Sequence, residues 1–178
     1  IYEVERFTVS LSSVFFDGWQ GGGANSINVS YSPGKVKLGT IDSSENSELS
    51  GSFNKIEYQI SRQQYVTETL SLYGLYQGQL TKDNLDSSEK FYLGGANGVR
   101  AYPSSEGGGS LGQSLSLELR YKLPKNQTLT AFYDWGQVKQ NADNNIASPA
   151  SPNQFHLEGA GVSYKWKFNE WLDLGLTY

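Results

Sequence analysis

Apolar and polar residues alternate along eight segments of the chain. In the clearest segment, Gln113–Lys122, the odd positions from Leu115 to Tyr121 are leucine or tyrosine, and the even positions are serine or charged. A two-residue period places alternate side chains on opposite faces of a β-strand, and no segment shows a helical period, so the pattern predicts an all-β, antiparallel protein. The predicted strands are Arg6–Phe16, Ser26–Ser32, Phe53–Ser61, Glu68–Leu80, Gln113–Lys122, Thr128–Val138, Phe155–Trp166 and Leu172–Tyr178.

The connections between these strands alternate between short and long. The long ones are the polar stretch Pro33–Ser52, a loop at about residues 81–112, and Lys139–Asn153. This alternation is typical of an up-and-down outer-membrane β-barrel, which has tight turns at one end and extended loops at the other. Tilted strands of about ten residues are long enough to cross the hydrocarbon core of a bilayer.

A soluble β-sandwich is the alternative, because the same alternation can separate a core from solvent. Two features favour the membrane barrel. The polar faces carry Glu118, Arg120 and Asp134 among serines and glycines, as expected of a water-filled lumen, and the loop lengths place the bulk of the loops at one end.

Composition excludes several classes of function. The net charge of −4 gives no electrostatic basis for binding nucleic acid, and the absence of cysteine excludes disulfides and thiolate metal sites. The single histidine, His156, has no partner for a catalytic triad or a metal site, so we expect no catalytic residue, metal or cofactor. The chain contains no apolar run of membrane-helix length, and it begins at Ile1, so we expect a processed or excised piece of a longer protein.

The long loop is rich in both glycine and aromatic residues, which predicts that it folds back and packs rather than remaining disordered. Gly94, Gly95 and Gly98 allow the backbone to take positive φ, and Val99–Tyr102 follows them. These glycines resemble a phosphate-binding loop, but no helix follows them, so we reject that reading.

Arg100 and Asp134 form the candidate pair of the site. Asp134 lies on the polar face of its strand, two residues before Gly136, and a loop folded inward would let the guanidinium reach that carboxylate. Glu118, on the polar face of the neighbouring strand, is a competing acceptor. Spacing alone also fits a solvated Arg100 and an Asp134 that binds water.

Two groups of loop carboxylates lack the spacing of a calcium loop and the apolar pocket of a glycosidase acid. We therefore expect both groups to be solvated in external loops. They are Asp83, Asp86 and Glu89 in one loop and Asp42, Glu45 and Glu48 in the other.

Three blocks of sequence resemble a known family, the two-partner secretion transporters, which are the TpsB branch of the Omp85 superfamily. The blocks, in order, are NLDSSEKFYLGGANGVRAYP at Asn84–Pro103, SLELRYKL at Ser116–Leu123 and AFYDWGQV at Ala131–Val138. Outside Asn84–Val138 the similarity is one of strand order and loop length.

The resemblance implies a Gram-negative outer-membrane barrel of about sixteen strands, preceded by periplasmic POTRA domains and surrounded by outer-membrane lipid. The family's lumen-directed loop carries a Val-Arg-Gly-aromatic motif, which corresponds here to Val99, Arg100, Ala101 and Tyr102. Its arginine is expected to meet Asp134, with Glu118, Arg120 and Gly136 on the same wall. Ala101 departs from the usual glycine, which questions a tip conformation that needs positive φ.

The same resemblance places the chain in the C-terminal part of the barrel, with the POTRA domains and first barrel strands absent. It implies a translocation pore that secretes an unfolded partner exoprotein of the adhesin or haemolysin type. Alternatives are an Omp85-type assembly factor for outer-membrane proteins and, with less support, a general porin.

Overall fold

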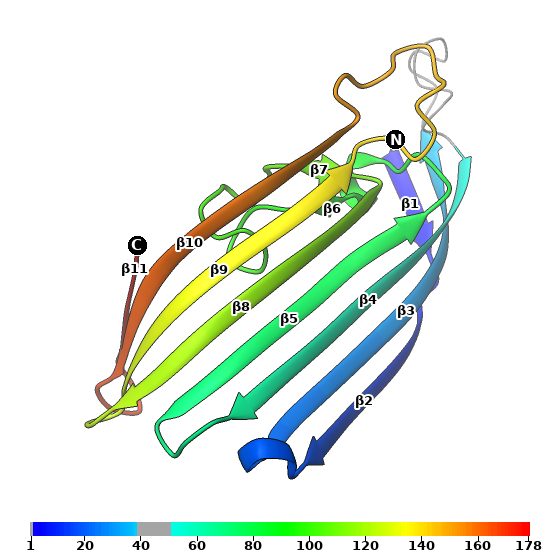
Figure 1. The fold of residues 1–178 in the computed structure, drawn as a ribbon. Helices are drawn as coiled ribbons and strands as arrows, with labels where there is room; N and C mark the ends of the chain where they lie inside the picture. The colour runs from blue at the N-terminus through cyan, green and yellow to red at the C-terminus, as the bar shows by residue number, and fades with distance from the viewer. Residues whose placement is uncertain (1, 39–50) are drawn as a thin grey trace.

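The computed structural model describes residues 2–38 and 51–178, and the acidic group Asp42, Glu45 and Glu48 lies outside these residues. The described residues form one large antiparallel sheet, in which strands mostly pair with their neighbours along the chain, and a separate two-stranded sheet (Figure 1). Its strands are β1 (Tyr2–Arg6), β2 (Val9–Asp17), β3 (Gly23–Leu38), β4 (Gly51–Tyr65), β5 (Leu70–Thr81), β8 (Leu111–Leu123), β9 (Gln127–Lys139), β10 (Gln154–Lys167) and β11 (Asp173–Thr177). The prediction of an all-β, antiparallel, up-and-down arrangement is confirmed.

Two predicted boundaries in the first part of the chain are wrong. The first strand begins earlier than Arg6, as β1 and β2, which both pair with β3. The stretch predicted as a polar connection, Pro33–Ser52, instead continues β3 to Leu38 and contains the start of β4.

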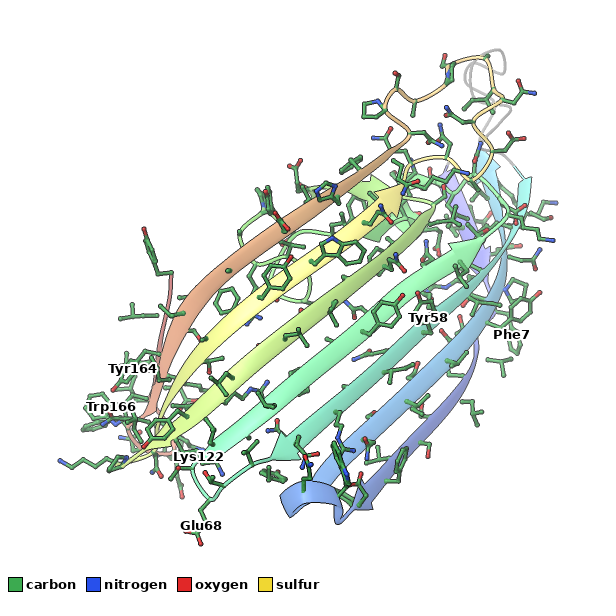
Figure 2. All side chains as sticks on the ribbon, in the orientation of Figure 1. Phe7, Tyr58, Glu68, Lys122, Tyr164 and Trp166 are labelled. Atoms are coloured by element: carbon green, nitrogen blue, oxygen red, sulfur yellow. The ribbon has the colours of Figure 1, made fainter. Side chains whose placement is uncertain are left out.

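The apolar faces of the strands are exposed on one side of the sheet. Ile60, Leu117 and Leu129 each keep between 45% and 47% of their surface exposed, and no second sheet covers them among the described residues. The sandwich alternative is therefore wrong. Tyr164 and Trp166 lie near the end of the sheet that carries the short turns, in keeping with an aromatic girdle (Figure 2).

Buried polar side chains lie on the opposite face of the sheet. They include Asp134, Gln79, Lys55 and Ser114, each with at most 4% of its surface exposed. Every buried side-chain nitrogen or oxygen of the described residues has a hydrogen-bond partner. Within residues 2–38 and 51–178, no helix has the length and apolar character needed to cross a membrane.

Candidate functional site

The connector, which we define as residues 82–110 between β5 and β8, covers part of the polar face of the sheet. It contains the short 3₁₀ helix η2 (Ser87–Glu89) and the small hairpin β6 (Phe91–Tyr92) and β7 (Gly108–Gly109). Figure 1 shows the connector behind β8, β9 and β10, on the side toward which the two ends of the sheet curve.

Within the connector, segments of backbone pack closely against one another. A Cβ on Gly94 or Gly98 would lie 1.9 Å from the carbonyl oxygen of Pro103 or Leu93, so only glycine fits at either position. Of these three loop glycines only Gly95 uses the positive φ that glycine allows, with a φ of 95°. Close packing of backbone, rather than left-handed geometry, selects glycine at those two sites.

Arg100 forms a forked ion pair with Asp134 of β9. Its Nε donates to Oδ2 at 2.8 Å, and its Nη2 donates to Oδ1 at 2.8 Å. The backbone N–H of Arg100 also donates to Oδ2, at 3.2 Å. Asp134 has no exposed surface, so this carboxylate depends on the connector for its compensating charge.

Glu118 of β8 accepts a third bond from the same guanidinium, at 2.7 Å from Nη1 to Oε1. The two candidate acceptors therefore do not compete, because Arg100 binds both at once. The planar group also lies over the ring of Phe132, with 3.8 Å from Cζ to the ring centroid. We call Arg100, Glu118, Phe132 and Asp134 the tip cluster.

The tip cluster keeps Arg100 charged. The hydrogen bonds that Arg100 donates to Asp134 raise the pKa of the Arg100 guanidinium above its ordinary value, and its bond to Glu118 adds to this effect. Arg120 does not reach the connector. It donates to Glu118 at 2.6 Å and to Gln63 at 2.8 Å, and it stacks on Tyr73, so its effect on Arg100 passes through Glu118.

Apolar contacts supplement the charges on both sides of Arg100. Leu93 and Val99 are fully buried. Leu93 occupies the space that a side chain at Gly136 would need, since a Cβ there would lie 2.6 Å from its Cδ2. Tyr102 closes the tip through a bond from its N–H to the Val99 carbonyl at 3.1 Å.

Ala101 packs directly on β10. Among the described residues the non-glycine positions with positive φ are Gln20, Lys125 and Asn126, so Ala101 has an ordinary backbone conformation. The doubt raised by alanine at this position is thereby removed. A Cβ on Gly159 would lie 2.9 Å from the Ala101 Cβ, so the bare glycine accommodates the alanine methyl group.

Sequence reasoning missed Phe132 and Gly159 as members of this site. Gly159 and Gly161 alternate on the polar face of β10, and glycine inside a strand often marks the close approach of another part of the chain. The two glycines could therefore have identified β10 as a strand against which the connector packs. The expectation that Glu89 is solvated is wrong, because it has 6% exposure and binds two cations.

The tip cluster has the features of a structural anchor for the connector. The described residues contain no group of three or more histidine, cysteine or carboxylate side chains that could hold a metal. Each charge of the tip cluster is paired, and the paired groups belong to different elements. Such an arrangement can hold a loop in one position and can release it only by separating buried charges.

Comparisons with known proteins relate this chain to a family of secretion proteins. The sequence model of the haemolysin secretion/activation proteins ShlB/FhaC/HecB matches residues 4–165. The heme/hemopexin transporter protein HuxB of Haemophilus influenzae is 27% identical over 125 residues, which cover 67% of this chain and 22% of that protein. HuxB of strain 86-028NP is likewise 27% identical over 118 residues, 63% of this chain and 21% of that protein.

Among solved structures, CdiB from Acinetobacter baumannii is similar with a TM-score of 0.46 and 17% identity, over 94% of this chain and 37% of that chain. The chain thus spans about a fifth of the length of the curated relatives that it matches.

Proposed function

The chain belongs to the haemolysin secretion/activation family of ShlB, FhaC and HecB, a family of outer-membrane transporters rather than enzymes, and we propose that it forms part of the wall of a translocation pore. The pore would secrete a large partner exoprotein of the adhesin or haemolysin type in an unfolded state. The remaining barrel strands and the periplasmic POTRA domains would come from other parts of the full-length protein.

The contrast between the two faces of the sheet supports a pore wall. The exposed apolar face suits lipid, and the satisfied polar face suits a hydrated lumen. A sheet with two edges leaves backbone groups unpaired, which hydrocarbon does not tolerate, so closure by further strands is part of the proposal.

The single observation that carries the proposal is the tip cluster, which fixes the connector on the polar face. In a closed barrel this face lines the lumen, so the connector would lie within the conduit and would shape the path of the exported chain. Export has no nucleotide supply at the outer membrane, and folding of the exoprotein outside the cell would provide the free energy.

The test replaces Arg100 or Asp134 by alanine in the full-length protein and measures the amount of exoprotein secreted. Removing either partner of a buried ion pair costs about 3–5 kcal/mol, so the connector should lose its fixed position and secretion should fall by at least about tenfold. Lys122→Ala is the matched control, since Lys122 is an exposed cation of β8 with no part in the cluster. Wild-type secretion by both variants, with normal insertion, would defeat the proposal.

A further inference from the structure

A second group of buried charges lies where the connector begins. The carboxylate of Glu89 lies 2.8 Å from Nη1 of Arg6 and 3.1 Å from Nζ of Lys55. The side chains of Glu89 and Lys55 are only 8% and 4% exposed, whereas that of Arg6 is 44% exposed. We call Arg6, Lys55, Gln79 and Glu89 the root cluster.

Lys55 and Gln79 also bind the backbone of the connector. Lys55 Nζ donates to the Gln79 Oε1 at 3.1 Å and to the carbonyl of Glu89 at 3.2 Å. The Gln79 amide donates to the carbonyls of Glu89 at 3.1 Å and Ser110 at 3.0 Å. The Gln79 amide therefore binds the connector both near its start, at Glu89, and at its end, at Ser110. Lys55 in turn donates to this amide.

The root cluster and the tip cluster share no residue and use different strands. The root cluster takes its partners from β1, β4 and β5, whereas the tip cluster takes its partners from β8 and β9. The connector consequently spans the polar face from one part of the sheet to another. Besides its covalent ends, the connector is therefore held at two separate places, which restricts its movement more than either cluster alone would.

We propose that Lys55 is a positioning residue that fixes the root of the connector through Glu89 and Gln79, independently of Arg100, and so sets how the connector crosses the conduit. This inference rests on the proposed function, because it assigns to Lys55 a share of the connector's role in export. Lys55 acts through the connector and needs no contact with the exported chain.

The test is amide hydrogen exchange on the full-length protein in detergent or nanodiscs, read by mass spectrometry. Lys55→Met keeps the bulk of the side chain but removes the charge and three donors, so exchange in residues 86–93 should rise by at least about tenfold while residues 96–103 change by less than about twofold. Arg100→Ala should give the reverse pattern. Lys55→Arg, which keeps the charge, should restore protection in residues 86–93.

Secretion is measured in parallel, and Lys55→Met should reduce it several-fold while Lys55→Arg restores it. If Lys55→Met fails to insert, Glu89→Gln and Gln79→Met provide the same comparison.

Unchanged exchange in residues 86–93, or an equal rise in residues 86–93 and 96–103, would overturn the proposal that Lys55 fixes the root of the connector independently of Arg100. Loss of protection with normal secretion would overturn the positioning role. Exchange does not depend on export, so failure of the pore proposal would be seen separately, as normal secretion by Arg100→Ala.

Discussion

The two faces of β9 place adjacent residues in opposite environments. Asp134 has no exposed surface and lies in a network of charges, whereas Tyr133, its neighbour, is 40% exposed on the apolar face. In a water-soluble sheet the apolar face is the covered one. The arrangement is inverted here, because the covered face is stabilised by paired polar groups and the apolar face is exposed.

The two faces of the sheet also differ in how closely their glycines are packed. On the polar face, the connector fills the space above Gly136 and Gly159 to within contact distance. On the apolar face, a Cβ at Gly74 would meet only the Leu117 Cδ2, at an ordinary 3.6 Å. At Gly74 the apolar face therefore has room for added volume but should not tolerate charge, whereas at Gly136 and Gly159 the polar face should not tolerate added volume.

The largest expected effect is that of a charge on the apolar face. Ile60→Arg should lower the free energy of unfolding by about 2–4 kcal/mol, because the guanidinium must leave water for hydrocarbon. Gln59→Arg is the matched control, since Gln59 is exposed on the polar face of the same strand. Denaturant unfolding of the full-length protein in lipid vesicles provides the measurement. Equal stabilities for the two variants would refute the assignment of the faces.

A methyl group on the polar face should have the next largest effect. Gly159→Ala forces its Cβ against that of Ala101, and overpacking of this kind typically costs about 1–3 kcal/mol. Hydrogen exchange in residues 96–103 should rise, because the tip must shift away from β10. Gly74→Ala on the apolar face should leave both stability and exchange unchanged. Similar behaviour of the two variants would contradict the difference in packing.

The smallest expected effect is that of Arg120. Arg120→Gln removes its bond to Glu118 but leaves Arg100 paired with Asp134, and the side chain of Arg120 is 34% exposed. Stability should fall by no more than about 1 kcal/mol, and secretion should stay well above that of Arg100→Ala. Quantitative secretion assays of the two variants side by side measure this order. A loss equal to that of Arg100→Ala would show that Arg120 acts on the connector more directly than through Glu118.

The strands and their faces could be predicted from the sequence, because each depends on a two-residue period that is local to the strand. The proximity of Glu118 to Asp134 can also be predicted from the sequence, because it depends only on the short turn between two neighbouring strands. The tight turn between β8 and β9 pairs Ser116 with Asp134 and places Glu118 on the same face, two residues along. The role of Arg100 in export stays a prediction.

The burial of Glu89 could not be predicted in this way. Its partner Lys55 is 34 residues away in the sequence, and neither residue stands in a local pattern that distinguishes it from a solvated charge. The length of β3 was also missed, because residues 33–38 contain a proline and a glycine, which usually end a strand. The burial of Glu89 and the length of β3 both depend on contacts between residues that are far apart in the sequence.

The contact between Ala101 and Gly159 has an evolutionary consequence. The two positions have room for one methyl group between them, and here the connector carries it. A relative with glycine in the connector would leave that volume vacant, and its strand could then carry the alanine. Substitutions at these two positions should therefore occur as exchanges, with each change permitted by the other.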